Sequence, residues 1–314
     1  MMSHAVLQLS TAEMKKMKTH YQNHLKQPAP QGALFAAKTD RAAITAYKSG
    51  KVLFQGKDAE QEAAKWADSS KKAPSQKTKP SSVNKHDYQP PDQLLHKVLI
   101  GSDETGTGDF FGPMTVAACH LSIEQLETVE SWGIRDSKTV TDKDIRQIAP
   151  KLIENCTYSL MTLHNKKYNT LQADGMNQGQ MKAMLHHQAI TNVLARIESS
   201  NASLDGVLID QFCPPATYFK YLRSGEQSWT AKTPLYFATK AESLHPAVAA
   251  ASILARYAFI EEMDRIEDKL GMPVPKGAGA KVDQAAQAIA DAHGIETLKA
   301  ITKWHFANAG KVKS

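Results

Sequence analysis

Two adjacent carboxylates open the stretch from Asp103 to Pro113, which reads DETGTGDFFGP. They come directly after residues 98–102, a short apolar run bounded by turn residues, which predicts a buried β-strand. Carboxylates close to a core must be paired, hydrogen-bonded or bound to a metal. The stretch contains no lysine or arginine. Because Mg²⁺ and Mn²⁺ prefer oxygen ligands, the sequence predicts a divalent-metal site at this strand end.

Two further acids follow predicted strands later in the chain. Asp210 closes the apolar run 207–209, and Glu242 follows the run 235–241. Loops at strand ends, held by a rigid sheet, often carry functional sites. Four converging carboxylates would repel one another, and two metal ions would relieve this repulsion while binding the attacking and leaving oxygens of a phosphodiester. A single strand-end acid is more often a helix cap or a surface charge, so the hypothesis depends on all four acids together.

Composition narrows the class of protein. The 314 residues suggest about two domains, and a hydrophobic content of 42% allows a sizeable core. The net charge of +6 and the pI of about 9.0 favour a polyanionic partner, although many basic proteins simply have solvated surfaces. Three separated cysteines without a Cys-x-x-Cys pair argue against a disulfide framework or a zinc site and fit a reducing cytoplasm. No secretory signal or bilayer-spanning run is recognisable, so we expect no membrane association.

The chain falls into three segments of different composition. Residues 1–68 predict a small α+β domain, in which Ser10 and Glu13 form a capping box for the first helix. Residues 69–95 are rich in Ser, Lys and Pro, which is typical of a flexible basic linker. Residues 96–314 alternate strands and helices, which predicts a layered α/β catalytic domain. Its expected strands are 98–102, 114–121, 158–163, 206–209 and 235–239, and its expected helices are 143–154, 179–197 and 247–268.

Four motifs, in this order along the chain, resemble those of the type 2 ribonucleases H. They are the stretch 103–113, the tripeptide 136–138 (DSK), the run 208–210 (LID) and residues 249–256 (AAASILAR). The resemblance covers residues 96–310 and implies a ribonuclease H-like mixed sheet with flanking helices. It also implies which acids are catalytic and bind metal: Asp103, Glu104, Asp210 and Glu242.

Within this group, the sequence is more similar to ribonuclease HIII than to ribonuclease HII. Glu242 stands where ribonuclease HII usually has aspartate, and Thr107 stands between two glycines where ribonuclease HII has arginine. Ala278, in the stretch Pro275–Gly279, takes the place of a tyrosine that helps ribonuclease HII to detect a DNA–RNA junction. The N-terminal domain, through the run Tyr47–Gly56, looks like the ribonuclease HIII domain that resembles the TATA-binding protein.

The resemblance implies endonucleolytic hydrolysis of the RNA strand of RNA/DNA hybrids by two Mg²⁺ or Mn²⁺ ions, leaving 5′-phosphate and 3′-hydroxyl ends. The 2′-hydroxyl distinguishes RNA from DNA, and a loop without bulky side chains lets backbone approach a ribose. Lys48 and Lys51 flank a turn of the N-terminal domain, where Tyr47 and Phe54 are either exposed for substrate or part of the core. The residues expected to bind nucleic acid are Gly106, Thr107, Gly108, Ser137, Lys138, Lys48 and Lys51.

Two other functions are compatible with these residues. One is a ribonuclease HII-like enzyme that acts on single ribonucleotides embedded in DNA. The other is a hybrid-binding protein without activity, although the presence of all four acids argues against it. The pair His186-His187 has no other histidine at metal-ligand spacing, so we expect no zinc site there. We expect a cytoplasmic monomer.

Overall fold

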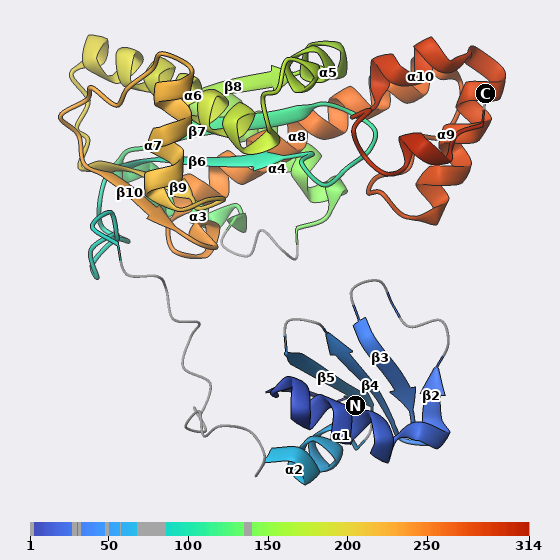
Figure 1. Cartoon of the computed structure of the whole chain (residues 1–314). Coiled ribbons are helices and arrows are strands. Elements are labelled where there is room, and N and C mark those ends of the chain that lie inside the picture. The colour runs from blue at the N-terminus through green and yellow to red at the C-terminus, as the bar shows by residue number, and fades with distance from the viewer. Residues whose placement is uncertain are drawn as a thin grey trace. The chain divides into compact units, whose positions relative to one another are not determined.

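The computed structural model describes residues 3–26, 30, 33–47, 50–56, 58–67, 86–134 and 140–313 (Figure 1). The chain divides into one unit within residues 1–82 and a second within residues 83–314, and each is described by itself. Lys48, Ser137 and Lys138 lie outside the described residues. Residues 69–85 of the predicted linker do so as well, and its flexibility stays a prediction.

The last ten residues of the predicted linker, 86–95, are part of the second unit. The backbone N–H of Phe237 donates to the carbonyl oxygen of Tyr88 at 2.9 Å, and the Tyr88 ring packs 5.1 Å from that of Phe219. Leu94 is buried in the core of the same unit. The boundary at residue 95 therefore differs from the structure, because Tyr88 and Leu94 supply apolar surface that the Ser, Lys and Pro content of the segment obscured.

The first unit is an antiparallel sheet with strand order β1-β5-β4-β3-β2 and two main helices. The capping box at its first helix is confirmed: the N–H of Glu13 donates to Ser10 Oγ at 3.3 Å, and the N–H of Ser10 donates to the Glu13 carboxylate at 2.6 Å. Its elements are β1 (Ser3–Gln8), α1 (Thr11–His20), η1 (Gln22–His24), β2 (Leu25–Lys26), β3 (Ala33–Lys38), β4 (Ala42–Tyr47), β5 (Lys51–Gly56) and α2 (Ala59–Ala67).

Alternation along the strands separates the two faces of this sheet. Phe54 and Ile44 are fully buried beneath the helices together with Met17 of α1. Phe54 is therefore a core residue, as one of the two interpretations held, whereas Tyr47 is half-buried and Lys51 is exposed. An antiparallel sheet with helices is the architecture expected of a domain that resembles the TATA-binding protein.

The second unit contains the predicted mixed sheet, with strand order β10-β9-β6-β7-β8. β6, β7 and β8 are antiparallel neighbours, while β9 is parallel to β6 and β10 is parallel to β9. All eight residues of β7 are buried, including the polar residues Thr115 and His120. The strands are β6 (Leu99–Thr105), β7 (Met114–Leu121), β8 (Thr157–Leu163), β9 (Gly206–Asp210) and β10 (Leu235–Ala238).

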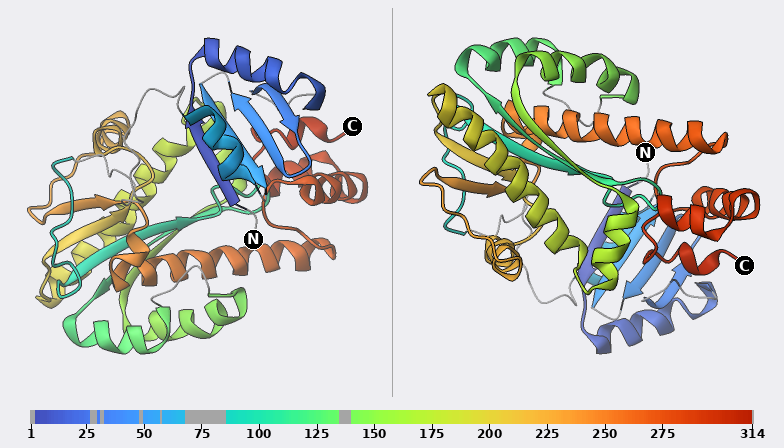
Figure 2. Two further views of the ribbon diagram at one scale, coloured as in Figure 1. Left: turned by 90° about the horizontal axis from the view of Figure 1, so that it is seen from below. Right: turned by 90° about the horizontal axis from the view of Figure 1, so that it is seen from above.

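Helices cover both faces of this sheet. Leu99 and Leu208 point into the cluster formed with α8, whereas Ile100 and Val207 point into the cluster formed with α6. Figure 2 shows α8 and α6 on opposite sides of the strands. The helices are α3 (Ile123–Ser131), α4 (Asp142–Asn155), α5 (Asn165–Ala173), α6 (Gln178–Ser200), α7 (Pro215–Ser224), η3 (Ala241–Ser243), α8 (Pro246–Leu270), α9 (Ala280–His293), α10 (Ile295–Ile301) and η4 (Ala309–Lys311).

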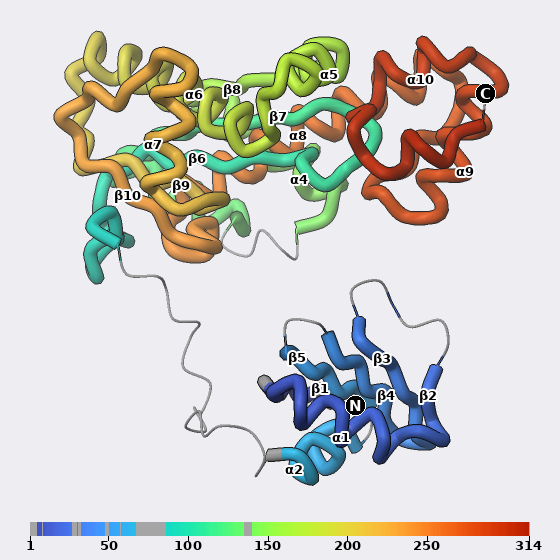
Figure 3. The backbone as a smooth tube through the Cα atoms, in the orientation of Figure 1, coloured from blue at the N-terminus to red at the C-terminus, as the bar shows by residue number. Residues whose placement is uncertain are grey.

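The C-terminal helices α9 and α10 form a small group at one end of the second unit (Figure 3). Phe110 and Phe111, from the loop that joins β6 to β7, are fully buried in their core. Phe111 also forms an isolated bridge with Thr302. The loop between β6 and β7 is thus held against the segment around Thr302.

Candidate active site

Asp103 lies near the end of β6 with 8% of its surface exposed. One carboxylate oxygen accepts the backbone N–H of Glu104 at 2.7 Å, and Ser252 of α8 is a further hydrogen-bond partner. α8 can come this close because of Gly101, where an added Cβ would lie 2.2 Å from the backbone of Ala247. A glycine in β6 and small residues in α8 therefore bring Asp103 under the helix.

The electrostatics of Asp103 are those of a crowded carboxylate. Burial, followed by the negative charges of Asp210 and Glu104, raises its pKa to about 8. The hydrogen bonds from Ser252 and from the backbone of Glu104 act in the other direction. A carboxylate whose ionisation is opposed by neighbouring acids fits a cation-binding site.

Asp210 and Glu242 meet at the ends of the next two strands. Asp210 closes β9 and accepts the backbone N–H of Ala241 at 2.9 Å, which fixes the start of η3, the turn that carries Glu242. Burial raises the pKa of Asp210, and the charges of Glu242 and Glu104 raise it further. Lys240 precedes this turn with φ of 58°, a backbone conformation that is strained for a residue with a side chain. Asp210 therefore lies within electrostatic reach of Asp103, Glu104 and Glu242.

Glu104 differs from the other acids because basic side chains hold it. Lys182 Nζ donates to Oε1 at 2.8 Å, and His186 Nε2 donates to Oε2 at 2.9 Å. Although burial acts to raise the pKa of Glu104, the His186 hydrogen bond and the charges of His186 and Lys182 lower it. Across the described part of the chain, no three His, Cys, Asp or Glu side chains are arranged to hold a metal ion as they stand, in keeping with this engagement of Glu104.

Sequence reasoning missed Lys182 and His186. The available signal was two polar residues four apart on a helix whose apolar stripe otherwise reads as core. The sequence analysis considered His186 only as a possible zinc ligand. In the structure its side chain is fully buried. A buried histidine next to a buried lysine on one helical turn indicates an acidic partner from another element.

The two glycines of the loop from Gly106 to Gly108 lie in different surroundings. Gly106 has φ of +85°, and an added Cβ would lie 2.3 Å from the carbonyl oxygen of Pro113, so only glycine fits there. An added Cβ at Gly108 would meet no described atom within 4 Å, so this position faces open space. Between them, the carbonyl oxygen of Thr107 accepts a hydrogen bond from Gln178 Nε2 at 2.9 Å, which anchors the loop to α6.

A fully buried lysine supports the remainder of this loop. Lys303 Nζ donates to the carbonyl oxygens of Asp109, Gly112 and Pro113 at 2.9, 2.6 and 3.2 Å. Burial lowers the pKa of Lys303 to about 7, and the charge of Asp109 opposes this shift. The backbone N–H of Gly277 donates to Asp109 Oδ1 at 2.6 Å, which places the segment containing Ala278 beside the loop.

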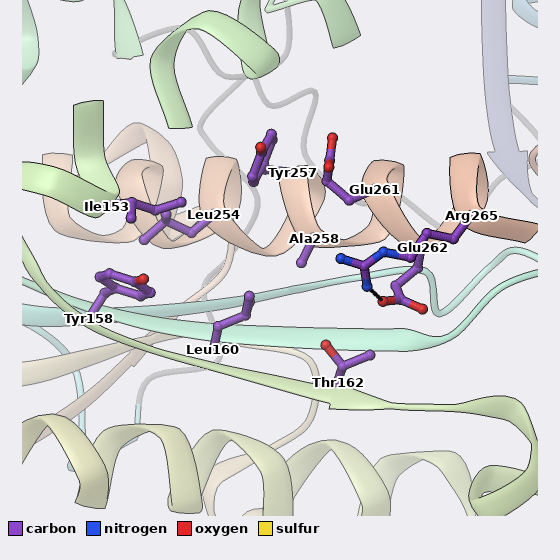
Figure 4. A pocket seen from close by; sticks show the side chains of 10 residues that line it. All are labelled: Ile153, Tyr158, Leu160, Thr162, Leu254, Tyr257, Ala258, Glu261, Glu262 and Arg265. Atoms are coloured by element: carbon purple, nitrogen blue, oxygen red, sulfur yellow. Dashed lines mark hydrogen bonds and ion pairs between the residues drawn. The ribbon is translucent and has the colours of Figure 1, made fainter. Parts of the chain in front are cut away.

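Figure 4 shows a separate hollow of about 280 Å³ between α4, β8 and α8. Leu160 and Tyr257 contribute apolar surface, and an ion pair between Glu262 and Arg265 lies at one edge. None of the four acids lines it. This pocket is therefore distinct from the candidate active site.

None of the described helices is long and apolar enough to cross a membrane.

A mixed sheet with carboxylates at the ends of neighbouring strands is the architecture of the ribonuclease H class of nucleases. Comparison with known proteins agrees. Residues 100–309 match the family described as "Ribonuclease HII", and residues 4–79 match one described as "Domain of unknown function (DUF3378)".

Individual relatives give the subfamily. "Ribonuclease HIII" of Bacillus cereus is 48% identical over 98% of this chain and 96% of its own length. "Ribonuclease HIII" of Bacillus licheniformis is 46% identical over 99% of this chain and 98% of its own. The crystal structure of Bst-RNase HIII in complex with Mn²⁺ is 42% identical, covers 98% of this chain and 97% of that one, and superimposes with a TM-score of 0.67. The chain therefore belongs to the ribonuclease HIII family of endoribonucleases, and the predicted family is confirmed.

Proposed function

We propose that this chain cleaves the RNA strand of RNA/DNA hybrids, using Asp103, Glu104, Asp210 and Glu242 to hold two divalent ions. The observation that carries the proposal is the gathering of acids at the ends of β6, β9 and β10, where Asp210 and Glu104 lie within electrostatic reach of buried Asp103. Added positive charge would stabilise this arrangement. The Mn²⁺ complex of a similar protein supports Mn²⁺ or Mg²⁺ as the ion. Two such ions, held by these acids, would supply an activated water and stabilisation of the leaving 3′ oxygen, and the products would carry 5′-phosphate and 3′-hydroxyl ends.

The chain's own residues divide the work of binding. Asp103 is buried and lies within electrostatic reach of Asp210 and Glu104, so these three acids would hold a divalent ion together. Asp210 also orders the turn that carries Glu242. Ser137 and Lys138 are proposed to contact the phosphate backbone, on the strength of the family resemblance.

Discrimination of RNA is proposed to lie in the loop Gly106–Gly108. Its backbone is held by Gln178, while Gly108 leaves the approach to a ribose open. A rigid backbone that reaches the 2′-hydroxyl can distinguish RNA from DNA without a bulky side chain. Lys48 and Lys51 of the first unit are proposed to bind the hybrid, in keeping with the net charge of +6.

The ribonuclease HII-like alternative fits less well. Ala278 lies in the segment beside the loop, where Asn308 Nδ2 donates to its carbonyl oxygen at 3.0 Å, and its methyl group has no ring to stack at a junction. Contacts must then be spread over several 2′-hydroxyls, and a lone ribonucleotide offers only one of them. We therefore propose cleavage within runs of ribonucleotides.

The deciding experiment compares two substrates with Mg²⁺ and with Mn²⁺: a uniform RNA/DNA hybrid and a DNA duplex with one embedded ribonucleotide. We expect a much higher kcat/KM on the hybrid, with 5′-phosphate ends identified by mass spectrometry. Comparable kcat/KM values on both substrates would establish the ribonuclease HII-like alternative. Binding without cleavage of either substrate would establish a hybrid-binding protein.

The role of the first unit is tested separately by comparing residues 83–314 with the whole chain. Deletion should weaken hybrid binding more than it lowers kcat at saturating substrate, because all four acids lie in the second unit. Binding by the whole chain should fall steeply with salt. Unchanged affinity would assign the first unit another role. Light scattering and cell fractionation test the expected monomer and its cytoplasmic location.

A further inference from the structure

Two side chains from one helix hold the carboxylate of Glu104. Lys182 and His186 are four residues apart on α6 and therefore lie on the same face. Lys182 bonds to Oε1 at 2.8 Å and His186 bonds to Oε2 at 2.9 Å. Each oxygen of Glu104 thus has its own basic partner, and the two partners differ in mobility.

His186 is a fixed partner. Its side chain is fully buried, its Nδ1 lies 2.7 Å from Ser102 Oγ, and its ring stacks on Phe212 with centroids 5.1 Å apart. The Ser102 hydroxyl in turn donates to the carbonyl oxygen of Ala117 at 2.9 Å. The imidazole is therefore tied to two neighbouring strands, β6 and β7, and cannot turn without breaking these bonds.

Lys182 is a movable partner. Its ammonium is a point charge on a four-carbon stem, and its side chain keeps 14% of its surface exposed. Nζ also lies 4.3 Å from the centre of the Phe212 ring, a position in which an aromatic face stabilises a cation. The ammonium can therefore leave the carboxylate oxygen and keep a favourable contact.

We propose that Lys182 is a displaceable counter-ion, which holds Glu104 Oε1 until a divalent ion takes that oxygen. We propose in addition that His186, anchored by Ser102, is a positioning residue that keeps Oε2 in place before and after this exchange. The inference rests on the proposed metal-dependent hydrolysis.

The test is Mn²⁺ binding to the full chain without substrate, followed by the electron paramagnetic resonance signal of free Mn²⁺. Lys182→Met removes the competing charge and keeps the length of the side chain, so Mn²⁺ should bind about tenfold more tightly. Lys269→Met removes the same charge at the far end of α8 and should leave the affinity within about twofold of wild type. Unchanged or weaker binding by Lys182→Met would overturn the displacement.

The anchor is tested with Ser102→Ala, which retains the imidazole but removes its Nδ1 partner, and with His186→Gln. Both should weaken Mn²⁺ binding about threefold to tenfold, because Oε2 is no longer oriented. Ser102→Ala is the milder variant and keeps the test open if His186→Gln does not fold. Mn²⁺ affinities unchanged in both variants would overturn the positioning role.

The opposite signs expected for Lys182→Met and Ser102→Ala separate these roles from a general structural effect, which would weaken binding in both. Asp103→Asn provides the reference for the metal site itself. If Asp103→Asn binds Mn²⁺ as wild type does, the proposed metal site is wrong. If Asp103→Asn loses Mn²⁺ while Lys182→Met is unchanged, only the counter-ion role is wrong.

Discussion

The second unit buries two ionisable side chains, Asp103 and Lys303, in different surroundings. Lys303 is fully buried and gives its N–H groups to three backbone carbonyl oxygens of one loop. Asp103 is 8% exposed and is surrounded by other acids, which oppose its ionisation. Burial disfavours the charged form of both side chains, but Lys303 is surrounded by acceptors that suit its N–H groups, whereas Asp103 is surrounded by further acids.

This difference separates a structural from a functional buried charge. A buried polar group that serves structure has its hydrogen bonds made within the chain. A group that serves chemistry is often kept in an unfavourable environment, which is relieved only by a ligand or a transition state. The loop that Lys303 supports follows the strand that carries Asp103, so Lys303 holds the backbone that leads out of this strand.

The largest expected effect is on catalysis. Asp103→Asn should lower cleavage of a hybrid at least about 1,000-fold, because the variant loses a ligand charge of the proposed metal site. Asp283→Asn removes the same charge from α9, where Asp283 pairs with Lys311 at 2.7 Å, and should cleave at the wild-type rate. Rates are measured at saturating Mg²⁺ on folded protein. Cleavage by Asp103→Asn close to wild type would remove this residue from the site.

Lys303→Met should show the largest loss of stability. The substitution takes the ammonium donor away from the carbonyl oxygens of Asp109 and Pro113, whereas Gly112 keeps a bond from Asn165 Nδ2 at 2.8 Å. Leaving buried polar groups without donors should lower the free energy of unfolding by about 3–4 kcal/mol. Urea denaturation followed by circular dichroism measures the change.

The matched control for this prediction is Lys299→Met. Lys299 is exposed and pairs with Glu296 at 2.7 Å, a surface contact worth about 0–1 kcal/mol. Equal destabilisation by the two variants would mean that the three carbonyl bonds of Lys303 contribute no more than a surface ion pair. Lys303 would then not be a buried group that stabilises the fold, and the comparison with Asp103 would fail.

The positions of the acids at strand ends could be predicted from the sequence. Asp103 and Asp210 end apolar runs, and such runs predict strands because the sheet is covered on both faces. β7 was predicted with its observed bounds, Met114–Leu121, for the same reason. Some helices were not predicted. In α5 only Asn165 and Tyr168 are buried, so apolar periodicity gives little signal there. In α9, by contrast, Val282, Ala286 and Ile289 are buried at helical spacing, and that signal in the sequence was missed.

The basic partners could not be predicted, because their roles depend on contacts between distant parts of the chain. Lys182 and His186 meet Glu104 from 78 and 82 residues away, and Lys303 reaches Gly112 from 191 residues away. No spacing rule connects such residues. A carboxylate at a strand end carries a local pattern, whereas the lysine that neutralises it is defined only by the packing of α6 on the sheet.

The stability of the metal-free protein should depend on pH through Asp103. Its folded pKa of about 8 lies above the ordinary value of 3.8, so the folded state retains a proton that the unfolded state has lost. Stability is therefore greatest below pH 4 on this account and is lost as the pH rises through 8. Asp103→Asn does not titrate and should be more stable than wild type by several kcal/mol at pH 9 in EDTA, at about 1.4 kcal/mol per pKa unit.

The measurement is a series of thermal melts between pH 5 and pH 9, in which the gain from Asp103→Asn should grow with pH. Asp283→Asn should instead lower stability at neutral pH, because the Lys311 hydrogen bond lowers the pKa of Asp283 and so favours its ionised form. A constant difference between Asp103→Asn and wild type over the whole range would show that Asp103 is not held against its ionisation. Asp103 would then be a buried side chain whose partners are supplied by the fold, as Lys303 is.

His245 provides the smallest expected effect and extends the comparison to a neutral buried group. It is 1% exposed at the start of α8, where Nδ1 accepts the backbone N–H of Ala247 at 3.1 Å and Nε2 donates to the carbonyl oxygen of Lys97 at 3.1 Å. Burial lowers its pKa to about 4, while the Lys97 bond opposes the shift. Because the unfolded state takes up this proton near pH 6.5, stability is present at neutral pH and is lost as the pH falls from 6.5 to 4.

His245→Asn keeps an acceptor for the helix cap and does not titrate. It should be less stable than wild type at pH 7, because it loses the bond to Lys97, and the deficit should shrink by about 2 kcal/mol between pH 7 and pH 4.5. Burial also lowers the pKa values of His120 and His187, but both are present in the variant and cancel in the difference. Parallel stability curves would exclude His245 as the titrating group. A converging pair would place it with Lys303, as a buried group whose partners are all supplied by the fold.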